Sequence, residues 1–193
     1  MSNKVFFIST NYLKSNTAIN ANVADELLNN SIFEAQSIHI QQLIGTDLYN
    51  KLVNLIKTNT IGDPQFADYK YLLDNYIVDC TAYWAWVECI PYLVAKVVNK
   101  GVERQNSEWS SPAAINEVEY LRDDLRNKAQ FYSQRLTDYL LQHRNLYPEF
   151  SQNHEIDKLR PQNGNYFSGI VFDDGSCPCE RTMGYPHNAI NIL

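Results

Sequence analysis

The sequence predicts a mainly α-helical protein: a small bundle of about four helices with an extended N-terminal segment and a long C-terminal arm. The first observation is a series of long stretches in which apolar residues recur every three or four positions, as on one face of a helix. The second is the low glycine content, 7 in 193 residues. The helical pattern stops near residue 150, so we divide the chain into a helical domain, residues 1–150, and an extended C-terminal arm, residues 151–193.

Composition and charge narrow the class of protein. A chain of 193 residues suits one domain with a core of its own, or one domain plus a tail. It is 45% hydrophobic and 20% charged, which is ordinary for a soluble globular protein. The formal net charge of -6 argues against a dominant basic surface that grips nucleic-acid phosphates. The opening "MSNKVFFIST" has an apolar run too short for a signal peptide.

The first two elements are expected before residue 46. Residues 5–9 are expected to form a short strand or an extended arm, and a polar loop should follow. Asn22 is a candidate N-cap for a first helix, because its side chain can accept a backbone hydrogen bond. Gly45 should end that helix, because glycine adopts positive φ at little cost, and Thr46 should cap the next one. The residues expected to line the buried face of the first helix are Val23, Leu27, Ile32, Ala35, Ile38 and Leu43.

Two more helices are expected before residue 99. The second should run from Asp47 to Lys57, with Leu48, Leu52, Leu55 and Ile56 inward. Asp63-Pro64 then begins a third helix, because proline is well tolerated at the first helical position. This helix is expected to run from about Gln65 to Val98, bent at Pro91 and ended by residues 99–101.

The fourth helix is expected from about Pro112 to His143, after a polar connection. Asp124 and Lys128 lie four residues apart on its outer face and can form a weak ion pair. The buried line of this helix is expected to comprise Ile115, Val118, Leu121, Leu125, Ala129, Tyr132, Leu136, Tyr139 and Leu140. Beyond it, residues 151–193 have no helical period and are rich in Asn, Gly, Pro, Ser and Asp.

The most apolar window, residues 76–98, is long enough to span a membrane. It contains Asp79, Glu88 and Lys96, and an Asp at the bilayer centre costs roughly 2.5–3.5 kcal/mol. We therefore expect a buried helix. Cys80 and Cys89 would lie on opposite faces of it, about 13 Å apart, which is too far for a disulfide. We therefore expect a reduced, intracellular chain.

The best metal-site candidate is the segment "CPCERTMGYPH", which offers Cys177, Cys179 and His187. Thiolates and an imidazole suit zinc, but structural zinc sites need four ligands and commonly use CxxC pairs. The residues that could complete the set are His154, Asp173 and Asp174. A lone CxC favours a loop over a zinc site, and we expect no metal and no cofactor.

Nothing in the sequence indicates catalysis. It contains no nucleophile elbow and no phosphate-binding glycine loop. His39 and His143 are expected to be structural. Asp79 and Glu88 would point to opposite sides of one helix, which argues against an acid–base pair. The aromatic group of Tyr83, Trp84, Trp86 and Tyr92 is expected to pack in the core and not to line a ligand pocket. We therefore expect that the protein is not an enzyme.

Several stretches carry a resemblance to a known family. They are residues 22–56 with the "LIG" helix end and the "DLY" restart, "NKG" at 99–101, "NSEWSSPA" at 106–113 and "AQFYSQRLTDYLLQHRNLYPEF" at 129–150. Over about residues 5–150 the chain resembles phage head–tail connector proteins, and most closely the ring proteins of crAss-like phages of Bacteroidetes hosts.

The resemblance implies a structural virion protein, a head–tail adaptor whose copies form a dodecameric ring between the portal and the tail. Its partners would be neighbouring copies, the portal protein and other tail or ring proteins. DNA would pass through the ring without specific binding, and no membrane would be involved. The protein would be made in the host cytoplasm and reside at the head–tail junction. The residues expected at its interfaces are Trp109, Tyr166, Phe167, Ile170, Phe172 and Tyr185.

Two other functions stay open at this point. The first is a small intracellular metal- or ligand-binding helical protein that uses Cys177, Cys179 and His187. The second is an enzyme that uses the aromatic group around Trp84 as its pocket.

Overall fold

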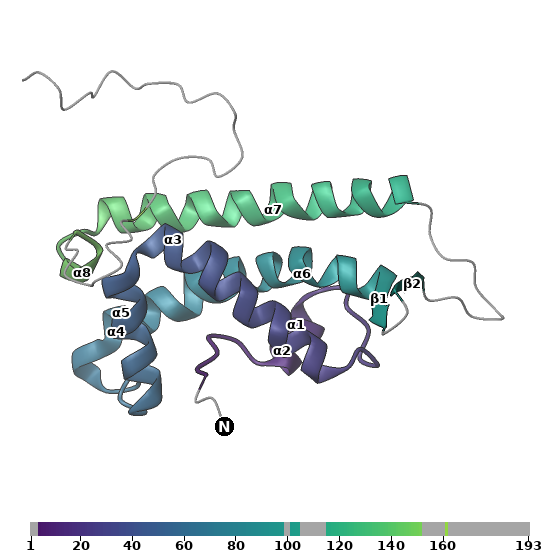
Figure 1. Ribbon diagram of the computed structural model, residues 1–193. Helices are drawn as coiled ribbons and strands as arrows, with labels where there is room; N and C mark the ends of the chain where they lie inside the picture. Colours follow the sequence, from purple (N-terminus) through teal and green to yellow (C-terminus); the bar gives the residue numbers. More distant parts are fainter. Residues whose placement is uncertain (1–3, 99–100, 105–114, 152–160, 162–193) are drawn as a thin grey trace, which may run out of the picture.

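The computed structural model describes residues 4–98, 101–104, 115–151 and 161, and side chains are described for these residues except 95–104 and 115 (Figure 1). This part is mainly helical, as predicted. Its elements are α1 (Thr10–Asn16), α2 (Asp25–Glu34), the π-helix η1 (Ala35–Ile40), α3 (Gln41–Ile44), α4 (Thr46–Lys57), the 3₁₀-helix η2 (Pro64–Phe66), α5 (Ala67–Leu72), the π-helix η3 (Leu73–Ile77), α6 (Val78–Val94), β1 (Ala95–Val98), β2 (Gly101–Arg104), α7 (Ile115–Gln142) and α8 (Pro148–Ser151).

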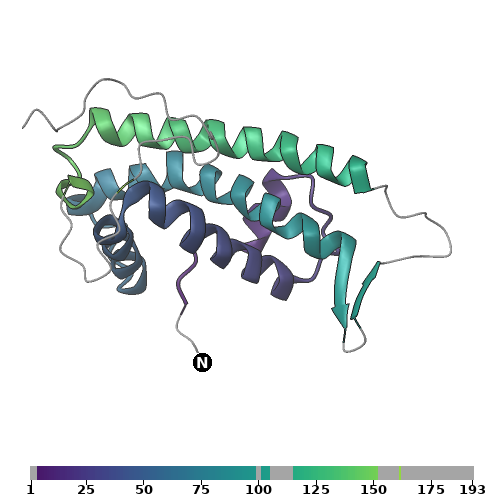
Figure 2. The same cartoon turned by 45° about the horizontal axis from the view of Figure 1, so that its top comes forward.

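Helix α6 is the centre of the molecule. It contacts α7 on one side and the continuous rod formed by α2, η1 and α3 on another. Figures 1 and 2 show α7 running along α6, with α4 and α5 at one end of the bundle and the β1–β2 hairpin at the other. The buried residues of α6 are Cys80, Thr81, Ala82, Trp84, Ala85, Val87, Cys89 and Ile90. A helix that is apolar all round is expected to be enclosed in this way.

Within the apolar window at residues 76–98, the stretch from Ile77 to Ile90 forms part of this core, as expected. Among the described residues, no helix is both long enough and apolar enough to cross a membrane. Cys80 and Cys89 are buried and free. Burial raises the pKa of the Cys80 thiol to about 12, so that thiol stays protonated.

The N-terminal segment excludes the strand alternative for residues 5–9, leaves the extended arm, and differs from the prediction in the loop that follows. Residues 5–8 form no strand. Phe7 and Ile8 are buried, and the Phe7 backbone N–H donates to Gln36 Oε1 at 2.9 Å. The predicted polar loop contains helix α1, which the sequence reading missed. The Ser9 hydroxyl accepts from the Tyr12 backbone N–H at 3.1 Å and Leu13 is fully buried, so a cap and one apolar anchor stabilise this short helix.

Asn22 is not the N-cap of the next helix, so that prediction was wrong. Its backbone N–H donates to the side chain of Asn20 at 2.9 Å, which stabilises a turn before the helix. Helix α2 begins at Asp25 without a side-chain cap. Asp25 and Glu26 in its first turn interact favourably with the positive end of the helix dipole.

The π-helix η1 changes which residues face the core. Here the Gln41 backbone N–H donates to the Gln36 carbonyl, five residues back, so the turn holds an extra residue. Ile38, predicted to be inward, is 42% exposed, while Ile40 and Ile44 are fully buried. The regular 3.6-residue period correctly placed Ile32, before the π-helix, and Ala35, its first residue, but failed at Ile38 within it.

Gly45 forms the corner between α3 and α4, as predicted. Its φ of 79° is positive, and its ψ of 159° places it in a region that essentially only glycine occupies. Its N–H donates to the Gln41 carbonyl at 2.9 Å and its carbonyl accepts from Tyr49 at 3.1 Å, so it closes one helix and opens the next. The N-cap of α4 is therefore Gly45. Thr46 is the first helical residue, where its hydroxyl accepts from the Gln41 side chain at 3.2 Å.

The long third helix was predicted only in part. Proline begins it as a 3₁₀ turn after Asp63, and Pro91 lies inside α6. The helix ends at Val94 and not at Val98. Residues 95–98 instead pair as an antiparallel strand with residues 101–104, in a register that places Val97 opposite Val102. Valines in succession favour extended backbone, and this preference prevails once the helix leaves the core.

Helix α7 follows the predicted pattern closely. Leu125, Ala129, Leu136 and Leu140 are buried, whereas Leu121, predicted to be inward, is 45% exposed. Lys128 and Asp124 form the expected ion pair, at 2.6 Å. The predicted start at Pro112 lies outside the described residues.

The Gly45 corner provides a test of the fold. Replacing Gly45 with Ala should lower the free energy of unfolding by about 1–3 kcal/mol, because a Cβ disfavours this backbone conformation. The matched control is Gly62→Ala, since Gly62 has negative φ and nothing within 4 Å of an added Cβ. The control should change stability by no more than about 0.5 kcal/mol in urea unfolding. Equal effects of the two substitutions would contradict the role assigned to Gly45.

Candidate interaction surface

The structure does not describe the residues that the sequence singled out for interfaces or metal binding. Outside the described residues lie Trp109, the aromatic residues of the C-terminal arm, and the metal-site candidates Cys177, Cys179 and His187. Within the described part of the chain, no group of three or more His, Cys, Asp or Glu side chains is arranged to hold a metal ion.

The aromatic group around Trp84 does not form a common pocket. Trp84 is 2% exposed, as expected for core packing, whereas Tyr92 is 44% exposed. Tyr83 and Trp86 are half-buried, with ring centroids 6.4 Å apart. The prediction of core packing is therefore correct for Trp84 and wrong for Tyr92.

Trp84 belongs to a chain of polar contacts across the core, which we call the polar bridge: His39, Trp84, Glu88 and Ser133. The His39 ring stacks on Trp84 at 3.7 Å, and His39 Nε2 lies 2.9 Å from Glu88 Oε1. On the other side, Trp84 Nε1 donates to Ser133 Oγ at 2.8 Å. The bridge therefore connects η1, α6 and α7.

The histidine and carboxylate of this bridge resemble an acid–base pair, but their setting favours a structural role. The His39 side chain is 4% exposed and its ring is held against Trp84. The hydrogen bond from His39 lowers the pKa of Glu88, so that carboxylate stays ionised. Asp79 is turned elsewhere and accepts from the Tyr12 hydroxyl at 2.9 Å, so it does not assist Glu88.

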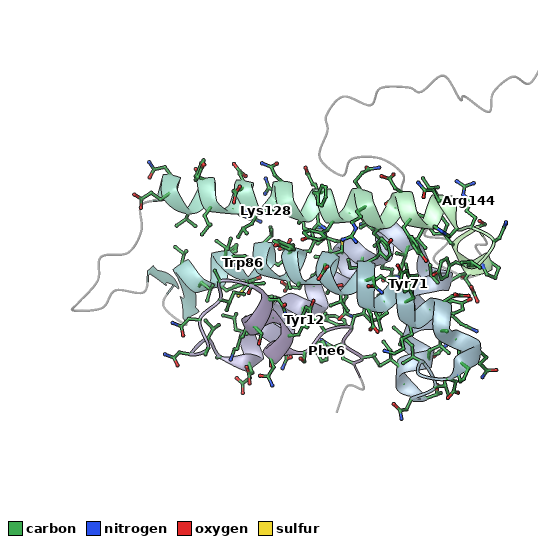
Figure 3. All side chains as sticks on the ribbon, turned by 180° about the vertical axis from the view of Figure 1, so that it is seen from behind. Phe6, Tyr12, Tyr71, Trp86, Lys128 and Arg144 are labelled. Atoms are coloured by element: carbon green, nitrogen blue, oxygen red, sulfur yellow. The ribbon has the colours of Figure 1, made fainter. Side chains whose placement is uncertain are left out.

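A second feature is a group of aromatic side chains where α5, η3 and α6 meet α7. We call it the tyrosine seam: Tyr71, Tyr76, Tyr83, Trp86, Tyr132 and Tyr139. Tyr76 stacks on Tyr139 with centroids 4.1 Å apart, and Tyr83 stacks on Tyr132 at 4.7 Å. Figure 3 shows Tyr71 toward one end of the molecule and Trp86 toward the hairpin end. Burial raises the pKa of the Tyr76 and Tyr132 hydroxyls, so both remain protonated.

One end of the seam opens into a groove on the surface of α7. The groove has a volume of about 340 Å³ and is lined by Tyr76, Phe131, Gln134, Arg135, Asp138, Tyr139 and Gln142. Phe131 is 64% exposed at its rim. The Arg135 guanidinium lies 5.0 Å from the centre of the Tyr76 ring, a cation–π contact. Asp138 accepts from Gln134 at 2.7 Å.

The sequence did not predict the groove, because some of its residues belong to the buried line of α7 and others do not. Tyr139 was assigned to the buried line of α7, while Phe131 and Arg135 lie outside that line. Tyr76 comes from η3, far away in the sequence. The available signal was the number of tyrosines, 13 in the chain. Exposed aromatic and arginine side chains are the residue types that protein interfaces prefer.

The polar bridge predicts how stability depends on pH. Because its folded pKa is lowered, Glu88 stabilises the fold above the ordinary glutamate value of 4.5, and this contribution is lost as the pH falls through the folded pKa. Glu88→Gln should cost about 1–2 kcal/mol near neutral pH and progressively less in acid. Urea midpoints measured at several pH values would show this convergence.

The control for this measurement is Asp74→Asn, which removes an exposed ion pair with Lys70. It should cost less than about 0.5 kcal/mol at every pH. A Glu88→Gln loss that stays constant from neutral pH into acid would contradict the role assigned to the Glu88 carboxylate.

Comparison with known proteins gives one family. A model of a family of unknown function, DUF6712, matches residues 40–159, which include α6, α7 and every residue of the groove. No curated protein and no solved structure matches the chain. The match covers more than half of the sequence, and the chain therefore belongs to the DUF6712 family.

Proposed function

We propose that this protein is a structural virion protein, a head–tail adaptor that forms a ring joining the portal to the tail and lining the DNA channel. The observation that carries the proposal is the resemblance of about residues 5–150 to phage connector ring proteins. The helix–glycine–helix corner at Gly45 is one of the features that carry it. The proposed partners are neighbouring copies, the portal and other tail or ring proteins.

The surface of the helical body supports an assembly role. Tyr71, Tyr120 and Phe131 are each more than half exposed. Large exposed aromatic side chains on stable helices are common at protein interfaces and cost little side-chain entropy when they bind. The groove beside Arg135 adds a concave feature that a partner side chain can enter.

The charge of the chain suits the proposed channel. Packaged DNA must slide through a portal ring, and a strongly cationic lining would hold its phosphates. The net charge of -6 is compatible with a lumen that binds DNA weakly. The protein would act by shape and by contacts with other proteins, without catalysis.

The alternative is a small intracellular metal- or ligand-binding helical protein. The sequence feature that favours it is the set of Cys177, Cys179 and His187, which suits zinc. Zinc content measured by elemental analysis separates the two functions. If the adaptor proposal is correct, the double substitution of Cys177 and Cys179 with Ser leaves assembly intact.

The decisive test is electron microscopy of the full chain mixed with the portal of its phage. We expect closed rings stacked on the portal, with the helical body as the repeating unit. The adaptor function would be overturned if the chain did not bind to the portal at any of a range of salt concentrations. The wild-type chain alone serves as the control for rings that form without the portal.

A further inference from the structure

Helix α7 contacts the core along one face and leaves its remaining surface uncovered among the described residues (Figures 1 and 2). That surface holds two separate features. Near the C-terminal end of the helix is the groove with Phe131 and Arg135. Near the N-terminal end is Tyr120, which is 78% exposed, beside the exposed Glu119. Both features combine an aromatic side chain with a charge.

The cation in the groove is available to a partner. Arg135 forms no ion pair with any residue that the structure describes, and its guanidinium lies over the Tyr76 ring. The nearby Asp138 is hydrogen-bonded to Gln134. The groove is therefore suited to a carboxylate next to an aromatic or apolar side chain.

The N-terminal end of α7 supplies that combination. Of the acidic residues in this half of the helix, Asp123 pairs with Arg126 at 3.0 Å and Asp124 pairs with Lys128 at 2.6 Å. Glu119 has no cationic partner in the described part of the chain. Its neighbour Tyr120 projects into solvent with most of its surface uncovered.

The spacing of the two charges favours a head-to-tail contact. Glu119 and Arg135 are sixteen residues apart, which corresponds to about 24 Å along the helix and about 160° around it. They therefore lie on opposite flanks of α7. A contact between opposite flanks joins each copy to two neighbours, which is the arrangement that a closed ring requires.

We propose that the groove of one copy binds the Glu119–Tyr120 segment of the next copy. Tyr120 enters the groove beside Tyr76 and Phe131, and Glu119 pairs with Arg135. The inference rests on the proposed function, because it assigns the contact by which neighbouring ring subunits join. It adds the segment, the site and the polarity of that contact.

The test is a charge exchange between the two sites in the full-length chain. Glu119→Arg and Arg135→Glu should each weaken self-association by at least about tenfold, because each places like charges in the contact. The equimolar mixture of these two variants should recover assembly. A contact between copies of different variants pairs an arginine with a glutamate, whereas a contact between two copies of the same variant places like charges together. The double variant Glu119→Arg/Arg135→Glu should also assemble. Assembly is measured by mass photometry in solution and by ring occupancy on the portal.

Matched controls separate this contact from a general effect of charge. Glu26→Arg and Lys57→Glu change the net charge by the same amounts at exposed positions on α2 and α4, and both should assemble like the wild type. Circular dichroism checks that all variants fold. The substitution Tyr120→Ala leaves every charge in place and should weaken self-association by at least about tenfold relative to the wild type.

The outcomes distinguish the two proposals. Rings that form equally well from the wild type and from both single variants would overturn this contact and leave the adaptor function standing. The contact would also be overturned if neither the single variants nor the double variant Glu119→Arg/Arg135→Glu assembled. A wild-type chain that stays monomeric both in solution and with the portal would overturn the contact and the adaptor function together.

Discussion

The fold depends on how one side chain, Trp84, joins three helical segments. Its ring stacks on His39 of η1 while its Nε1 donates to Ser133 of α7, so contacts on both sides of α6 converge on a single residue. Apolar packing alone would allow α2–η1–α3 and α7 to slide along α6, because hydrophobic contact has no direction. A stacked ring and a hydrogen bond do have directions. The stacking and the hydrogen bond therefore fix how η1 and α7 are aligned along α6. This alignment sets the positions of the exposed residues of α7 relative to the rest of the molecule.

The sequence predicted the fold best where one period continued through a helix. In α7 and α4 most of the residues expected to be inward, such as Leu125 and Leu52, are buried, although Leu121 of α7 is 45% exposed. The prediction failed where backbone hydrogen bonds changed type. In η1 the five-residue bond from Gln41 to Gln36 turns Ile38 outward, and no residue type in "AQSIHI" signals this. From within this π-helix His39 stacks on Trp84 and lies within hydrogen-bond distance of Glu88, so tertiary contacts hold the segment in place.

The candidate site was less predictable than the fold. A periodic sequence reveals which face of a helix is buried but not which residues of two helices meet at its edge. Tyr76 and Tyr139 stack although 63 positions separate them, and either one alone looks like ordinary core. Arg135 looks like a solvated charge until Tyr76 is found beneath it. The groove exists only because η3 is packed against α7, and this packing is a property of the tertiary structure.

Helix α7 has the properties of a spacer between neighbouring subunits. It has 28 residues, about 42 Å in length, and contains neither glycine nor proline. Its inner face is anchored to α6 through Leu125, Ala129 and Leu136. A groove and an acidic tyrosine segment on one anchored helix are held at a constant separation, so a neighbour bound at one end is fixed relative to a neighbour bound at the other. Contacts carried on separate loops would not transmit that geometry, and a ring closes only when the rotation between successive copies is constant.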